Sequence, residues 1–306
     1  PGPGVRVIAR DTGGGFGQKV VPMREDMCIL LAARKVSAPL KWIEDRRENL
    51  MSAGQARHVD GRARMAFDAD GAITAVDIDF IQDIGAYPPH PPVPGADDRR
   101  DRNVLSRPPL PVPKSSFNYK TVFTNTSGLA AYRGPWQYET LTREILLDIA
   151  ARKMGIDPVE LRRKNLLRRD EMPFFNPNGM PYDHVAPMET FEQAVKILDH
   201  EGFRKEQAEA LAQGGRYLGL GFSAYIEPTG AATGHLATEG CTIRMEPTGK
   251  INVYVNGGSS GNSIETTVVQ LTADALGADI ADVSTIQGDT AVTPYGAGTQ
   301  AAAADR

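Results

Sequence analysis

Two glycine-rich segments contain the residues of this chain that could bind a ligand through the backbone. The first, at 11–19, reads Asp-Thr-Gly-Gly-Gly-Phe-Gly-Gln-Lys and lies between a strand-like run and a stretch of helical composition. Glycine allows the backbone to turn sharply and to approach a ligand closely, and the free N–H groups of a following helix can face an anion. Gln18 stands where a dinucleotide fingerprint needs a third glycine, and Lys19 does not follow a glycine as in a Walker loop. A ligand-binding loop and a tight connection both remain open at this point.

The second segment, at 257–261, reads Gly-Gly-Ser-Ser-Gly and follows a strand-like run. This pattern occurs at the nucleophile elbow of α/β-hydrolases, where the central serine attacks the substrate. A hydrolase of that type needs a histidine further along the chain, but the last histidine, His235, precedes Ser259. We therefore interpret the segment as a second glycine-rich loop that leads into a helix.

A third candidate precedes the clearest helical pattern. Arg133 and Gly134 stand just before 136–154, where backbone N–H groups and one guanidinium could face an anion. An ordinary helix start explains the same residues. The five histidines are not spaced from one another, or from Cys28 and Cys241, as zinc ligands would be. We expect the two cysteines to be buried thiols in a reducing compartment, and hence a cytoplasmic protein.

The elements that must position these segments follow from hydrophobic periodicity and turn residues. Strands are expected at 5–10, 40–44, 62–68, 73–82, 217–226, 242–246, 251–256 and 283–287. Helices are expected at 24–36, 136–154, 158–167, 191–198 and 264–276. In the helix at 136–154, one apolar face is formed at helical spacing by Leu141, Ile145, Ile149 and Ala150.

Length and composition set the fold class. At 306 residues the chain is long enough for about two domains, and we expect an α+β fold with two mixed α/β parts, residues 1–213 and 214–306. The hydrophobic content of 41% is that of a globular protein. The net charge of −4 argues against nucleic acid or an anionic membrane as a partner. No apolar run is long enough to span a membrane.

Several segments together resemble one protein family. Nine segments resemble, in the same order, the molybdopterin-binding large subunit of the xanthine dehydrogenase, aldehyde oxidase and carbon monoxide dehydrogenase family. They are 5–19, 24–26, 31–35, 41–49, 131–134, 157–165, 261–270, 288–290 and 293–299. The resemblance covers essentially all of the chain. It implies the two-part molybdenum cofactor-binding domain of a molybdenum hydroxylase, with the second part truncated, and we interpret the chain as the middle of a longer subunit.

The resemblance also implies a set of site residues. The residues matched to cofactor binding are Gly14, Gly15, Phe16, Gly17, Arg133, Gly134, Gly261, Asn262, Ser263, Thr266 and Ala301. Of these, Phe16, Arg133 and Ala301 are expected near molybdenum without being side-chain ligands. The family's general base is a glutamate in a Gly-x-Gly-Glu motif, which this sequence does not contain. The catalytic residue is therefore expected outside this chain, and Glu265 is one of the carboxylates to test if it is not.

The resemblance further implies an activity and its partners. The family hydroxylates a carbon of aldehydes or nitrogen heteroaromatics with oxygen from water. The cofactor is molybdenum–molybdopterin, in bacteria commonly the cytosine dinucleotide form. Electrons leave through 2Fe-2S clusters and FAD, here expected on a small iron–sulfur subunit and a medium FAD-binding subunit. The expected assembly is a dimer of heterotrimers that acts on a small-molecule substrate.

Three departures from the family pattern keep a second hypothesis open. Gly134 stands where carbon monoxide dehydrogenases carry the cysteine that bridges copper, so CO oxidation is disfavoured. The family's Gly-Gln-Gly-His reads Gly-Asn-Ser-Ile at 261–264, and hydroxyl-bearing positions read Ala302 and Ala304. A cofactor-free structural or degenerate paralogue would show such changes. We expect residues 1–306 alone to be inactive.

Overall fold

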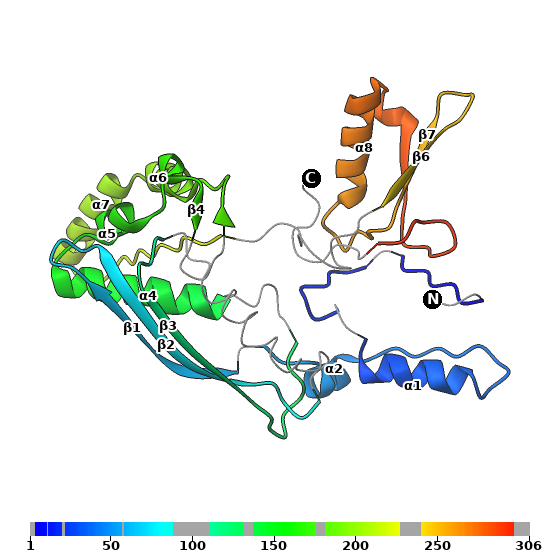
Figure 1. The fold of residues 1–306 in the computed structure, drawn as a ribbon, viewed down its shortest axis with the longest axis horizontal. Coiled ribbons are helices and arrows are strands. Elements are labelled where there is room, and N and C mark those ends of the chain that lie inside the picture. The colour runs from blue at the N-terminus through cyan, green and yellow to red at the C-terminus, as the bar shows by residue number, and fades with distance from the viewer. Residues whose placement is uncertain are drawn as a thin grey trace. The chain divides into compact units, whose positions relative to one another are not determined.

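The computed structural model describes residues 4–10, 12–19, 22–56, 58–87, 110–130, 137–175, 181–226 and 240–296. The chain forms two compact units (Figure 1): unit 1 combines Pro1–Val20 with Glu227–Arg306, and unit 2 is Val21–Ile226. The predicted domain boundary between residues 213 and 214 falls inside unit 2. These units are defined by contacts within the chain, so the division into two domains at this position stays a prediction. The predicted α+β fold is confirmed, because each unit holds a small mixed sheet with helices.

Unit 2 is built on a three-stranded sheet. Its strands are β1 (Val59–Phe67), β2 (Ile73–Asp83) and β3 (Ser115–Val122). The central strand, β2, pairs antiparallel with β1 and parallel with β3. The hairpin predicted from the sequence is confirmed, and its turn is closed by the Asp68 carboxylate, which accepts from the Ala72 N–H at 2.8 Å. Strand β3 was not predicted.

The helices of unit 2 agree with the sequence pattern in four places. The helices are α1 (Arg24–Ala33), α2 (Arg46–Ser52), α4 (Gln137–Met154), α5 (Pro158–Asn165), α6 (Pro187–Leu198) and α7 (His200–Gln213). Unit 2 also contains a 3-10 turn, η1 (Arg169–Glu171), and a short pair of strands, β4 (Phe174–Phe175) and β5 (Pro181–Tyr182). The sequence pattern predicted α1, α4, α5 and α6 but neither α2 nor α7. The strands predicted at 40–44 and 217–226 are wrong, because neither segment pairs with a strand.

The buried face of α4 contains charged as well as apolar side chains. Glu139, Arg143 and Glu144 are 5–6% exposed, whereas Leu141 and Ile145 of the predicted apolar face are 61% and 48% exposed. The predicted apolar face is correct in part: Ala150 is 8% exposed, whereas Leu141 and Ile145 meet no partner that buries them. Helical spacing identifies an apolar stripe but not where that stripe meets a partner. The inward side of α4 combines the ion pairs with Leu147, Ala150 and Ala151, which belong to the same core cluster as residues of β2.

Several apolar side chains of unit 2 lie at its surface. No residue of α1 or α2 is buried, and Leu30 and Leu50 are 61% and 70% exposed. Cys28 on α1 is exposed, as is Cys241 on the outer strand of unit 1. The prediction that both cysteines are buried is therefore wrong.

Unit 1 repeats the topology of a hairpin followed by a parallel strand. Its elements are β6 (Cys241–Met245), β7 (Ile251–Val255), α8 (Ile264–Leu276), a 3-10 turn, η3 (Ile280–Asp282), and β8 (Val283–Ile286). β7 pairs antiparallel with β6 and parallel with β8. Helix α8 has the predicted bounds, and Gly277 ends it at φ 63°. Because β7 and β8 are parallel, the residues that follow both strands lie at the same edge of the sheet.

Candidate functional site

The loop between β7 and α8, residues 256–263, lies at that sheet edge. Gly261 has φ 98° and Ser263, the residue before the helix, has φ 57°. A serine in the left-handed region is costly unless other contacts hold it there. The structure provides them: the Ser263 N–H donates to the Ser259 Oγ at 3.2 Å, and the Ser260 N–H donates to the Asn262 Oδ1 at 3.1 Å.

Residues on α8 and after β8 complete this set of contacts. The Ser259 N–H donates to the Gln287 Oε1 at 3.1 Å, and the Gln287 amide reaches the Glu265 carboxylate in a long contact of 3.5 Å. Hydrogen bonds from its own N–H and from the Ser259 hydroxyl lower the pKa of Glu265. A carboxylate that is held ionised in this way is a poorer proton acceptor at neutral pH. Glu265 is thus placed as a support of the loop and not as a general base.

The loop at 12–19 is the second part of the candidate site. Gly14, Phe16 and Gly17 have φ of 89°, 50° and 82°. A Cβ added at Gly14 would lie 2.3 Å from the Phe16 ring, so only glycine fits beneath that ring. Phe16 itself remains 49% exposed. The loop thus presents an aromatic side chain on a sharply turned backbone.

The segment after β8 connects the two loops within unit 1. The Ala9 N–H donates to the Gly288 carbonyl at 2.7 Å, and the Thr290 N–H donates to the Val7 carbonyl at 3.1 Å. Asp289 forms an ion pair with Arg6, and the hydrogen bond from this guanidinium lowers the pKa of Asp289 to about 2. Gln287, the preceding residue, contacts the 256–263 loop. Residues 287–290 therefore touch both the strand-like run before the Phe16 loop and the loop before α8.

Comparison with known families identifies the family to which the chain belongs. Two models described as "Molybdopterin cofactor-binding domain" match residues 1–166 and 193–304. The chain belongs to the large-subunit family of the molybdenum hydroxylases. The resemblance expected from the sequence is confirmed, and the observed fold is that of the cofactor-binding domains of these proteins.

Individual members of the family align with nearly all of the chain. The nicotine 6-hydroxylase large subunit of Paenarthrobacter nicotinovorans is 34% identical over 96% of this chain and 37% of its own length. The carbon monoxide dehydrogenase large chain of Hydrogenophaga pseudoflava is 29% identical over 96% of this chain and 38% of its own length. The crystal structure of quinoline 2-oxidoreductase from Pseudomonas putida 86 superposes with a TM-score of 0.88 and 36% identity. The superposition covers 97% of this chain and 38% of the quinoline 2-oxidoreductase chain. The chain therefore spans less than two fifths of the length of these molybdenum hydroxylase subunits.

The described loops leave room for a molybdopterin beside their glycines. A Cβ added at Gly13, Gly15 or Gly261 would meet no atom within 4 Å, so the space beside the backbone is open at these positions. The backbone groups before α8 also lie at the positive end of the helix dipole, which favours the phosphate of a pterin cofactor. Thr266, in the first turn of α8, is exposed on the same helix.

The predicted site residues fall into two groups. Gly14, Gly15, Phe16 and Gly17 lie in one loop of unit 1, and Gly261, Asn262, Ser263 and Thr266 lie in and after the other. Arg133, Gly134 and Ala301 lie outside the described residues, as do Ala302 and Ala304. The assignment of all these residues to the cofactor remains a prediction.

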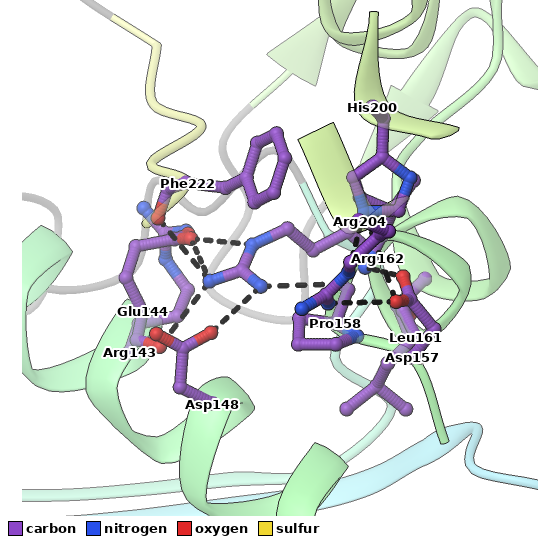
Figure 2. Close-up of polar contacts among 12 residues, drawn as sticks. Arg143, Glu144, Asp148, Asp157, Pro158, Leu161, Arg162, His200, Arg204 and Phe222 are labelled. Atoms are coloured by element: carbon purple, nitrogen blue, oxygen red, sulfur yellow. Dashed lines mark hydrogen bonds and ion pairs between the residues drawn. The ribbon is translucent and has the colours of Figure 1, made fainter. Parts of the chain in front are cut away.

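A second polar cluster, in unit 2, serves a different purpose (Figure 2). The Arg162 side chain is 1% exposed and donates to the Glu144 and Asp148 carboxylates, each at 2.9 Å. It also donates to the Phe222 carbonyl at 3.2 Å, while Arg143 donates to the Ala224 carbonyl at 2.9 Å. The segment at 217–226 pairs with no strand of the described residues, and these guanidinium groups supply hydrogen-bond donors to its carbonyls in place of a neighbouring strand.

Burial and charge act in opposite directions in this cluster. Burial raises the pKa of Glu144, although Arg143 and Arg162 oppose that shift. Burial lowers the pKa of Arg143, but the carboxylates of Glu139 and Glu144 outweigh it, and the net shift is upward. Every charged group here is paired to another group of unit 2, so we assign the cluster to structure.

Sequence reasoning missed the supporting role of Gln287 and assigned other candidate roles to Ser259 and Glu265. The hydroxyl of Ser259 is engaged by the loop, and no histidine contacts it in the part of the chain that the structure describes. The signal that could have located Gln287 is the order strand, helix, strand at 251–286. That order predicts parallel strands, whose carboxyl ends bring the residue after β8 next to the loop after β7.

Proposed function

We propose that this chain is part of a molybdenum hydroxylase subunit that hydroxylates a ring carbon of a nitrogen heteroaromatic or, as the second substrate class, the carbonyl carbon of an aldehyde. The observation that carries the proposal is the pair of glycine-containing loops in unit 1, which have open space at Gly13, Gly15 and Gly261 and lie within the two matched molybdopterin cofactor-binding domains. Two similar proteins are named for nicotine and quinoline, which are both nitrogen heteroaromatics, and this favours the first class.

The reaction replaces a C–H hydrogen of the substrate by a hydroxyl group from water and releases two protons and two electrons. When bound, the molybdenum cofactor supplies the two-electron redox chemistry of this reaction. The residues described here bind and orient that group, Phe16 through its exposed ring and the loop before α8 through its backbone. We propose the cytosine dinucleotide form of the cofactor, and partner subunits that carry 2Fe-2S clusters and FAD and pass the electrons on.

The test uses the full-length subunit in its native complex. Molybdenum is measured per chain, and turnover is measured with a dye acceptor on a panel of nitrogen heteroaromatics and aldehydes. We expect molybdenum near one per chain and turnover within the heteroaromatic group. Molybdenum near one per chain with turnover of aldehydes alone would shift the proposal to the second substrate class.

Asn262 and Ser263 favour a second candidate, a cofactor-free paralogue that keeps the fold of the family. This candidate predicts no molybdenum in an otherwise folded complex. A hydrolase based on Ser259 has less support, because its hydroxyl is held by loop contacts. We expect no labelling of the protein by a fluorophosphonate probe, and labelling at Ser259 would contradict that expectation. CO oxidation is disfavoured by Gly134, which offers no thiolate for copper.

A further inference from the structure

We propose that the side chains of Ser259, Asn262, Glu265 and Gln287 form a brace that holds the 257–263 loop in its binding shape before the cofactor arrives. The inference rests on the proposed function, since it assigns positioning residues for the same cofactor. It also gives Asn262, which departs from the family pattern, a role in shaping the loop in place of being a sign of a lost cofactor.

The brace connects three parts of unit 1. Ser259 is its centre, because its backbone donates to the Gln287 Oε1 at 3.1 Å and its Oγ accepts from the Ser263 N–H at 3.2 Å. The same hydroxyl lies 3.4 Å from the Asn262 Oδ1 and also bonds to Glu265. The loop is thereby tied to the first turn of α8 and to the residue that follows β8.

The left-handed backbone at Ser263 explains why such a brace is needed. A glycine in that position would adopt φ 57° at little cost, whereas a serine adopts it only when its neighbours hold it. The bond from the Ser263 N–H to Ser259 acts directly on the strained residue. The cost of a serine in place of the family's glycine at 263 is thus offset by the hydrogen bond from the Ser263 N–H to the Ser259 Oγ.

The shorter side chain of Asn262 has a defined use in this brace. Its Oδ1 accepts from the Ser260 N–H at 3.1 Å, two residues back in the chain. A glutamine is one methylene longer, so on the same backbone its amide oxygen would be displaced from the position of the Asn262 Oδ1. Asn262 therefore acts by shaping the loop, and the family's glutamine at this position would loosen it. The cofactor-free alternative makes the opposite prediction, namely that Asn262→Gln restores binding.

The test compares variants of the full-length subunit in its complex. Ser259→Ala removes the central hydroxyl, Ser259→Thr keeps it, and Asn262→Gln restores the family residue. Ser260→Ala is the matched control, because the hydrogen bond of Ser260 in this loop is made by its backbone. Two readouts are taken: hydrogen exchange of the peptide covering 258–267 in complexes prepared without molybdate, and molybdenum content together with its rate of release in loaded complexes.

We expect Ser259→Ala to speed exchange of this peptide roughly 5- to 30-fold, as for the loss of two hydrogen bonds, and to release molybdenum faster. Asn262→Gln should act in the same direction with a smaller effect. Ser259→Thr and Ser260→Ala should resemble the wild type in both readouts.

Three outcomes would overturn the proposal. Unchanged exchange in Ser259→Ala would show that the brace does not hold the loop. Faster exchange with unchanged molybdenum retention would show that the loop shape does not matter for the cofactor. A gain of molybdenum in Asn262→Gln would show that Asn262 does not help to hold the loop in its binding shape. A wild-type complex without molybdenum, by contrast, refutes the proposed function and the positioning role together.

Discussion

The two units hold irregular backbone in place by different means. In unit 2, buried guanidinium groups of Arg143 and Arg162 donate to the carbonyls of the 222–224 segment, and their charges are balanced by carboxylates of α4. In unit 1, half-buried and exposed side chains brace the loop before α8, and the single charge among them is Glu265.

The difference follows from what each segment must do. A buried ion pair cannot lose one partner without leaving the other charge in a poorly solvated place, so opening the unit 2 segment is costly. Hydrogen bonds among half-buried and exposed side chains can exchange with water at a lower cost. The unit 1 loop can therefore be shaped in advance and still admit a ligand. This comparison predicts large stability effects in unit 2 and effects on cofactor retention in unit 1.

The largest effect is expected for Arg162→Met in unit 2. This change leaves the Glu144 and Asp148 carboxylates without their cation and removes the donor to the Phe222 carbonyl. The loss of a buried ion-pair partner costs about 3–5 kcal/mol. Thermal unfolding of the full-length subunit measures it. The control is Arg169→Met, since Arg169 is 74% exposed and its contact with Glu189 is 3.5 Å long. Equal shifts for both variants would contradict the contrast between buried and exposed charge.

A smaller loss of stability is expected for Asn165→Ala, which tests buried neutral bonds in unit 2. The Asn165 side chain accepts from the Ile73 N–H and donates to the Gly71 carbonyl, each at 2.8 Å, so it ties α5 to the β1–β2 hairpin. Unsatisfied buried backbone groups cost roughly 1–3 kcal/mol. Asn118→Ala removes an exposed bond to Asp79 and serves as the control. A shift no larger than that of the control would show that the hairpin does not depend on α5.

Gly14→Ala extends the comparison to the Phe16 loop of unit 1. The new Cβ meets the Phe16 ring, and the backbone has φ 89°, which disfavours alanine by roughly 1–2 kcal/mol. Because the loop is exposed, we expect little change in the unfolding midpoint but a clear fall in molybdenum content. Gly219→Ala is the matched control, since its Cβ also meets nothing within 4 Å and Gly219 lies outside both loops. Equal molybdenum in the two variants would show that the shape of this loop is not needed.

The smallest effect is expected for Asp289→Asn, which removes the ion pair with Arg6. The pKa of Asp289 is lowered to about 2 by the Arg6 guanidinium, against about 3.9 in an unfolded chain. The folded state thus gains stability from this carboxylate above about pH 4 and loses that gain as the pH falls toward 2. Unfolding midpoints of wild type and variant should differ slightly at pH 6, and this difference should shrink as the pH falls from about 4 toward 2. A constant difference across this range would exclude the charge as its cause.

The sequence predicted those elements whose limits are marked locally. The Asp157 side chain caps α5 by accepting from the Val159 N–H at 2.8 Å, as the Asp-Pro-x-Glu pattern indicates. Gly277 ends α8, and Gly71 lies in the β1–β2 turn with φ 88°. Caps and turns depend on adjacent residues, so they can be identified without knowledge of the rest of the fold.

Elements that depend on distant partners were predicted wrongly or missed. The alternating segment at 217–226 has the residues of a strand, but guanidinium groups from α4 and α5 take its carbonyls. Strand β3 was missed because its pairing partner, β2, lies far away in the sequence. The apolar stripe of α4 was predicted correctly only in part: Ala150 became buried, whereas Leu141 and Ile145 stayed exposed.

By itself, the sequence determined the glycine-rich loops, the α+β class and the membership of the molybdenum hydroxylase family, because glycine positions and motif order are local properties. Only the tertiary structure decided what the side chains around those glycines do. Ser259 could have been a nucleophile and Glu265 a base as far as spacing shows. The parallel pairing of β7 and β8 brings Gln287 beside them and joins all three in one set of contacts. Such a contact depends on strand pairing across many residues, which no local pattern encodes.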